Sequence, residues 1–272
     1  MGTVVWLIAL LPLAWWTGMA EGATDLETPV CGRIREPLAF WLFRRAAGSP
    51  DPARLQGLAG VEPVFHRTED GRRLGGYRLR AENPRGYLLI AQGNAMLADQ
   101  ILPELAYFRD RGLEVYVFDY RGYGLSEGRS RLKAIVSDYR ELVRKLDAEG
   151  YRRRYLYGMS MGGIILLNAV GRTDLYHALV VDSSPSRIST YGCPAAYDPV
   201  AHLPEDASRI MVLVGLRDTV VPPGESKRLA RTVERRGGTV RVVPEFAHPF
   251  QDVDPTLRRR RLQMVADFLL LR

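Results

Sequence analysis

The chain has 272 residues, of which 46% are hydrophobic and 25% are charged. This composition excludes a disordered chain, a collagen, a coiled coil and a small disulfide-rich protein. The formal net charge of +7 suggests an anionic partner, but only three of the 38 basic residues are lysines, which indicates an arginine-rich surface along the whole chain. No basic motif with interleaved aromatic residues accompanies the arginines, so we expect no nucleic-acid partner.

The N-terminal end carries an apolar run, Val4–Trp16. This run is shorter than the roughly 20 residues of a membrane-spanning helix and has the length of a signal-peptide core. Small residues allow cleavage after Ala20 or after Gly22, but no Lys or Arg precedes the run. We therefore predict an exported protein, periplasmic or secreted, with residues 1–22 as a signal peptide. An N-terminal segment that stays as a membrane anchor is the alternative, and a plain helix is a third reading.

Two cysteines, Cys31 and Cys193, follow this run. In an exported protein they are able to form one disulfide across a long loop, whereas otherwise they are two separate thiols. The sequence leaves both possibilities open. Two cysteines without a histidine cluster give no zinc site, and we predict neither a metal nor a cofactor.

The rest of the chain divides into an irregular segment and one regular domain. Residues 23–60 show no clear periodicity, and the apolar stretch Ala39–Phe43 predicts that this segment packs onto the core. From residue 61 to residue 272 the pattern predicts one α/β domain. It begins with a hairpin of Val61–His66 and Leu74–Arg80.

After the hairpin, strands and helices alternate. The expected strands are Gly86–Ala91, Glu114–Phe118, Arg154–Tyr157, Ala178–Val181, Ile210–Val214 and Val240–Val243. The expected helices lie near Met96–Arg111, Leu132–Ala148, Gly162–Val170, Gly224–Arg236 and Pro255–Leu271. Continuously apolar strands are typical of a parallel sheet covered by helices on both faces. Function is then expected at the carboxyl ends of the strands.

One of these strands runs directly into the motif G-x-S-x-G, Gly158–Gly162. The motif lies between a strand and an apolar helix, which is the setting of a nucleophile elbow. Its glycines remove side chains that would clash in the tight turn around Ser160. A structural turn with an incidental serine is the alternative.

A serine nucleophile needs a base, and the chain has only four histidines. His248 lies between the last strand and the last helix, where the order Ser, acid, His places the base. Asp218 follows the expected strand Ile210–Val214 and is the expected acid, with Asp182 as its rival. Helix capping or loop packing are the alternatives for all three residues.

Acyl transfer also needs donors for an oxyanion. The main-chain N–H of Met161, directly after the nucleophile, is one expected donor. The other is the N–H of Asn94, in the loop that follows the strand Gly86–Ala91.

These landmarks occur in the order found in the α/β-hydrolase superfamily, which the chain resembles over residues 61–272. The segment Asp119–Gly128 is similar to the D-x-R-G-x-G-x-S turn of the serine aminopeptidase-like and acyl-protein-thioesterase-like branch, and we expect it to be structural. The resemblance implies an α/β-hydrolase fold, with a mostly parallel sheet, an antiparallel N-terminal hairpin and helices on both faces. Gln92 replaces the usual His of the oxyanion loop. Only residues 182–209 lie where relatives insert a cap, so we expect no large cap domain.

The expected function is that of a serine hydrolase, which cleaves esters or thioesters of a small-molecule or acyl substrate through an acyl-enzyme. A peptidase of the serine aminopeptidase type and an inactive hydrolase-fold binding protein are the alternatives, because this fold carries many functions. Membrane association is possible through the N-terminus. The charge run Arg258–Arg261 offers a contact for anionic lipid as a weaker alternative, but we interpret it as a solvated face, as such runs usually are.

Overall fold

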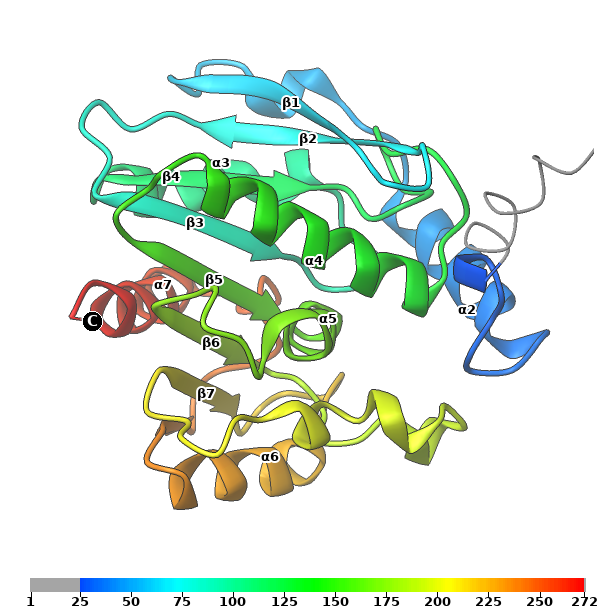
Figure 1. Cartoon of the computed structure of the whole chain (residues 1–272). Coiled ribbons are helices and arrows are strands. Elements are labelled where there is room, and N and C mark those ends of the chain that lie inside the picture. Colours follow the sequence, from blue (N-terminus) through cyan, green and yellow to red (C-terminus); the bar gives the residue numbers. More distant parts are fainter. Residues whose placement is uncertain (1–24, 272) are drawn as a thin grey trace, which may run out of the picture.

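We describe residues 25–271 of the chain from a computed structural model, so the predicted signal segment 1–22 lies outside the described residues. Two strands form a hairpin from residue 61, and strands and helices alternate from residue 86 onward (Figure 1). The strands are β1 (Val61–Arg67), β2 (Arg73–Leu79), β3 (Gly86–Ala91), β4 (Leu113–Phe118), β5 (Arg154–Met159), β6 (Ala178–Asp182), β7 (Ile210–Gly215) and β8 (Thr239–Val243). The helices are α2 (Arg35–Ala47), α3 (Ala98–Arg109), α4 (Leu132–Ala148), α5 (Met161–Val170), α6 (Pro223–Arg235) and α7 (Pro255–Leu270).

The eight strands form one sheet in the order β1-β2-β4-β3-β5-β6-β7-β8. β1 and β2 form an antiparallel hairpin, β2 pairs antiparallel with β4, and every later pairing is parallel. The parallel pairings align the carboxyl ends of β3, β5, β6, β7 and β8 along one edge. The predicted fold class, an α/β-hydrolase fold with an N-terminal hairpin, is confirmed.

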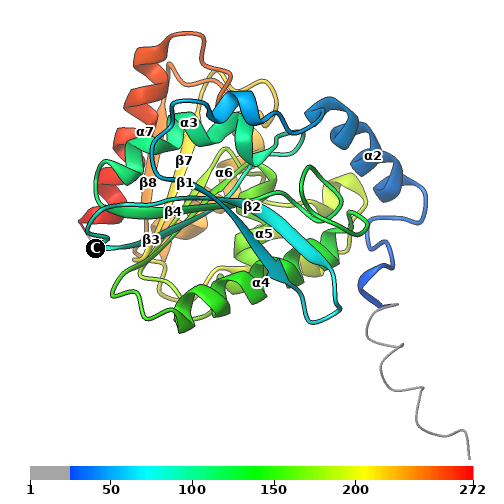
Figure 2. The same cartoon turned by 90° about the horizontal axis from the view of Figure 1, so that it is seen from above.

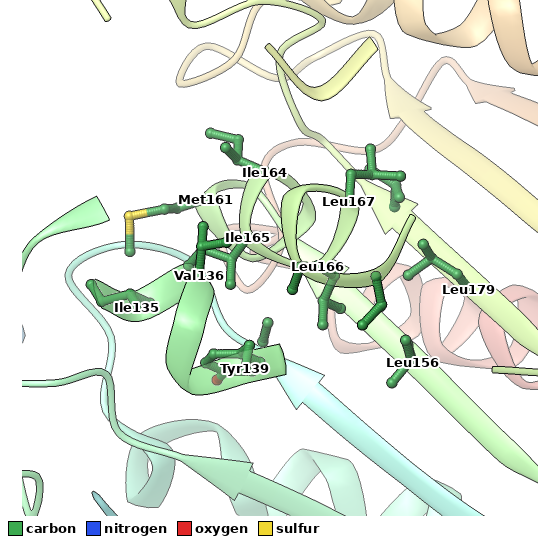
Figure 3. Packing of buried hydrophobic residues seen from close by; sticks show 14 of the residues in the cluster. Ile135, Val136, Tyr139, Leu156, Met161, Ile164, Ile165, Leu166, Leu167 and Leu179 are labelled. Atoms are coloured by element: carbon green, nitrogen blue, oxygen red, sulfur yellow. The ribbon is translucent and has the colours of Figure 1, made fainter. Parts of the chain in front are cut away.

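Helices cover both faces of the sheet, as the continuously apolar strands predict (Figure 2). One core lies between the sheet and α4, α5 and α6, and a second lies between the sheet and α3 and α7. α5 is buried along its whole length. Figure 3 shows Ile165 and Leu166 of this helix packed beside Val136 of α4 and Leu156 of β5. α5 is therefore fixed at its N-terminus, where Ser160 precedes it.

The crossover from β6 to β7 contains only three short 3-10 helices: η2 (Ser189–Tyr191), η3 (Ala195–Tyr197) and η4 (Pro199–His202). No cap domain occurs among the described residues, which agrees with the prediction from the length of this segment.

The expectation of an irregular segment over residues 23–60 is wrong, because it contains α2 and the 3-10 helix η1 (Pro52–Leu55). α2 has no clear helical period, since apolar side chains occupy more than one of its faces. Phe40 packs into the core, whereas Leu38 and Trp41 are exposed. Glu36 anchors the helix, because its carboxylate accepts hydrogen bonds from the N–H groups of Cys31 and Leu132 at 2.6 and 3.0 Å.

The two cysteines are joined by a disulfide, Cys31–Cys193. This bond links the start of α2 to the β6–β7 crossover. The guanidinium of Arg35 also donates to the carbonyl of Tyr191 at 2.8 Å. The N-terminal segment and the crossover are therefore tied together beyond the carboxyl edge of the sheet.

Candidate active site

Ser160 lies at the sharp turn between β5 and α5, with φ 54° and ψ −115°. A non-glycine residue rarely adopts such a positive φ, and its strain persists only where the surroundings fix it. Here the Ser160 N–H donates to the Asp182 carbonyl at 2.8 Å, and the Ser160 carbonyl accepts from the Ser184 hydroxyl at 2.7 Å. Ser160 is largely buried, with 9% of its surface exposed.

The glycines of the motif allow the turn to pack against its neighbours. A Cβ at Gly162 would lie 1.8 Å from the carbonyl oxygen of Ala91, at the end of β3. A Cβ at Gly158 would lie 2.7 Å from the main chain of Gly162. Only glycine fits at either position, as the motif predicts.

Asp218 and His248 meet at the same edge of the sheet. The Nδ1 of His248 lies 2.8 Å from the Oδ2 of Asp218, and both residues are buried. The other carboxylate oxygen of Asp218 accepts from the N–H groups of Val220 and Val221 at 2.9 and 2.8 Å. The acid is thus held by its own loop and aimed at the imidazole.

Burial pushes the pKa of the Asp218 carboxyl upward, but the hydrogen bonds from His248 and from the Val221 N–H outweigh it, so the pKa lies below its ordinary value. Asp218 is therefore a carboxylate at neutral pH. A carboxylate at Nδ1 fixes the tautomer and orientation of the ring and leaves Nε2 as the basic nitrogen.

Asp182, the rival acid, faces other partners. Its carboxylate accepts from Arg261 at 2.7 Å and from the Tyr157 hydroxyl at 2.8 Å. The structure therefore pairs His248 with Asp218 and uses Asp182 in a separate buried network.

Arg261 connects this network to the loop of His248. It lies 3.2 Å from Asp252, and its Nη2 donates to the carbonyl of Ala247 at 2.5 Å. The Ala247 N–H in turn donates to Asp252 at 2.8 Å. Both main-chain groups of the residue before His248 are therefore fixed by buried charges.

The interpretation of Arg258–Arg261 as a solvated charge run is wrong for Arg261, which is 3% exposed. Arg258 and Arg260 pair instead with Glu104 and Glu245, at 3.3 and 3.6 Å. The buried role of Arg261 has no signal in the sequence, because it depends on which side of α7 faces the end of β6.

The loop after β3 lies opposite the turn of Ser160. A Cβ at Gly93 would lie 3.8 Å from the Cβ of Ser160. The next residue, Asn94, accepts a hydrogen bond from the Tyr123 hydroxyl at 2.8 Å. Met161 begins α5, and first-turn N–H groups have no partner within the helix. The two expected donor residues therefore flank the serine from different elements.

Gln92, which replaces the usual histidine, is fully buried and donates from Nε2 to the Phe118 carbonyl at 3.0 Å. The hydroxyl of Tyr120 donates to the main-chain carbonyl of Gln92. Residues at the end of β4 and just after it therefore hold Gln92, and with it the start of the loop that contains Asn94.

The turn after β4 is built by its own polar groups. Asp119 accepts from the N–H groups of Ala98 and Leu125 at 2.8 and 2.9 Å. Arg121 is fully buried between Asp70 and Asp138. These contacts agree with the structural role expected for the D-x-R-G-x-G-x-S segment.

A hollow of about 990 Å³ lies at the opposite edge of the sheet, lined in part by Gly60, Arg80 and Gly112. It contains none of the expected site residues. We place the candidate site at the carboxyl edge, where the strained serine and the His–Asp pair occur.

Known proteins agree with this fold. A family model described as "Serine aminopeptidase, S33" matches residues 82–203. An esterase of Pyrococcus furiosus has a similar structure, with a TM-score of 0.65 and 17% identity over 82% of this chain and 95% of that one. The chain has the α/β-hydrolase fold, and its residues 82–203 are similar to the serine aminopeptidase family.

Two curated relatives are similar over part of their length. The uncharacterized protein YfhR of Escherichia coli K12 is 30% identical over 140 residues, covering 48% of this chain and 49% of that protein. The mouse α/β hydrolase domain-containing protein 17C is 27% identical over 184 residues, covering 60% of this chain and 55% of that protein. The chain thus spans about half the length of these relatives.

Proposed function

We propose that this hydrolase is a serine hydrolase that cleaves carboxylic esters or thioesters through an acyl-enzyme. The observation that carries the proposal is the buried hydrogen bond of 2.8 Å between His248 and Asp218. It lies at the sheet edge where the turn of Ser160 is held in strained geometry.

In the proposed reaction, the Ser160 oxygen attacks the carbonyl carbon while His248 takes the hydroxyl proton. The N–H groups of Asn94 and Met161 stabilise the oxyanion. Collapse of the tetrahedral intermediate expels the alcohol or thiol, which receives the proton from His248. Water then attacks the acyl-enzyme with His248 as the base, and the carboxylic acid leaves.

A peptidase is the second candidate, and the name of the matching family model favours it. An amide has a poorer leaving group than an ester. A peptidase of this type also benefits from a cap that holds the substrate's amino end, and the crossover offers only short 3-10 helices. We therefore prefer the ester or thioester.

The test is a panel of p-nitrophenyl esters of graded acyl length, acyl thioesters and aminoacyl anilides, assayed with the full chain. We expect turnover of esters or thioesters, and Ser160→Ala should lower it by roughly 10³ or more. Ser49→Ala, an exposed serine outside the site, is the matched control and should keep full activity. Preferred cleavage of anilides would support the peptidase, and unchanged activity of Ser160→Ala would contradict both candidates.

A further inference from the structure

The outer side of α2 carries exposed large apolar side chains. Ile34, directly before the helix, is 81% exposed, and Leu38, Trp41 and Leu42 are 51%, 46% and 52% exposed. These positions follow the spacing i, i+4, i+7, i+8, so they share one side of the helix. Glu36, Phe40 and Ala47, which lie on another side of the helix, are buried against the protein, while Phe43 is 41% exposed.

The charges around this apolar side are basic. Arg33, Arg35, Arg44 and Arg45 are all exposed. The sole acidic residue from Pro29 to Ser49 is Glu36, which is buried. The Glu36 carboxylate accepts hydrogen bonds from main-chain N–H groups and is not available to a partner. All exposed charged side chains from residue 29 to residue 49 are therefore basic.

α2 also lies on the same side of the molecule as the candidate site. It lies beyond the edge to which the arrows of β3 and β5 point (Figure 1) and stands out from the body of the molecule (Figure 2). The Ala47 carbonyl, in its last turn, accepts from Gln100 of α3 at 2.7 Å. Burial raises the pKa of Tyr123, and the charge of Arg44 opposes this rise. The Tyr123 hydroxyl donates to Asn94.

We infer that α2 docks on the surface of an anionic lipid bilayer, with Leu38, Trp41 and Leu42 inserted among the acyl chains and the arginines at the headgroups. A helix with apolar side chains and a basic rim lies in the interface in this way, with Trp and the stems of Arg at headgroup level. A protein partner with an acidic groove or a second copy of the chain would also cover apolar area. The bilayer is preferred because the exposed apolar side chains lie on one side of a helix that stands out from the molecule, and the charged side chains beside them are basic (Figure 2).

Docking through α2 turns the carboxyl edge of the sheet toward the lipid surface. An acyl ester held in that surface would then reach the Ser160 turn without passing through bulk water. The docking itself does not depend on the proposed reaction, since it is measured without substrate.

The test is co-sedimentation of the full chain with phosphatidylcholine vesicles, with and without phosphatidylglycerol. We expect binding to the anionic vesicles that weakens with salt. Trp41→Ser/Leu42→Ser should lower the partition coefficient by roughly tenfold or more. Arg44→Gln/Arg45→Gln should lower it by roughly tenfold and remove much of the salt dependence.

The matched control is Leu271→Ser, which removes an 84% exposed apolar side chain directly after α7, on the other side of the molecule from α2 (Figure 1), and should bind like the wild type. Hydrogen exchange should show slower amide exchange in α2 when anionic vesicles are added. The proposal is overturned if the full chain does not bind, or if Trp41→Ser/Leu42→Ser binds as well as the wild type. The latter result would place the contact elsewhere, such as in residues 1–24. It is also overturned if that variant only abolishes self-association.

Discussion

Asp182 and Asp218 are both buried carboxylates near the carboxyl edge of the sheet, and their partners separate their roles. Asp218 faces His248, whereas Asp182 faces Arg261. The sequence ranks Asp218 first from its place after β7, but the contacts of Asp182 depend on tertiary packing that no motif encodes.

Asp218→Asn should lower kcat/KM for an ester by roughly 10⁴, because an amide at Nδ1 permits the wrong tautomer of His248. Asp182→Asn is the comparison: it should destabilise the protein by about 3–5 kcal/mol while the folded enzyme keeps its activity within roughly tenfold. Steady-state kinetics and urea unfolding of both variants check this. A larger loss of activity in Asp182→Asn than in Asp218→Asn would reverse the assignment.

The lowered pKa of Asp218 gives a pH dependence of stability. Because the carboxyl ionises more readily in the folded state, its contribution is complete above its unfolded pKa, about 4, and is lost as the pH falls through the lower folded value. The unfolding free energies of the wild type and Asp218→Asn should therefore differ most at pH 7 and approach each other as the pH falls below the unfolded pKa toward the lower folded value. A constant difference across this range would show that ionisation of the Asp218 carboxyl does not carry the effect.

At the scale of elements, the loop of His248 depends on α7. Arg261 reaches from this helix to Asp252 and to the Ala247 carbonyl. The loop contains the expected base, but the guanidinium that fixes the loop belongs to Arg261, in a charge run that the sequence suggests is solvated.

Arg261→Met should lower the unfolding free energy by about 3–5 kcal/mol, because it leaves Asp182 and Asp252 buried without their cation. It should also lower kcat more than it raises KM, since a displaced His248 affects the reaction more than substrate binding. Arg261→Lys should recover part of both losses. An unchanged kcat in the folded Arg261→Met protein would limit this residue to stability.

The disulfide between the start of α2 and the crossover gives a second prediction at the scale of secondary-structure elements. Cys31 and Cys193 are 162 residues apart, and the bond holds the start of α2 against the crossover. The variant Cys31→Ser/Cys193→Ser should unfold with a free energy lower by about 2–4 kcal/mol. A reductant should lower the Tm of the wild type and leave that of the variant unchanged; an equal response of both proteins would argue against the bond.

Sequence reasoning succeeds for the strands because the apolar runs of β3 and β7 have one physical explanation, burial on both faces of a sheet. It fails for α2, whose apolar residues lie on a buried side and an exposed side and so erase the helical period. The exposed residues of α2 are unfavourable in water, and only the surface of the folded protein reveals that nothing in the described chain covers them.

For the whole molecule, one sheet carries Ser160, Asp218 and His248 on loops at its carboxyl edge, spread over 89 residues of sequence. This shared edge is predictable because the connections of parallel strands place their carboxyl ends together. The basic surface of α2 and the tie between the N-terminal segment and the crossover are visible only once the chain is folded.

The most direct test is labelling of the full chain with a fluorophosphonate, followed by peptide mapping. The account predicts a covalent adduct on Ser160 in the native protein, none in Ser160→Ala or in heat-denatured protein, and much slower labelling in His248→Ala. No labelling under conditions in which a control esterase reacts, or an adduct on a different serine, would contradict it.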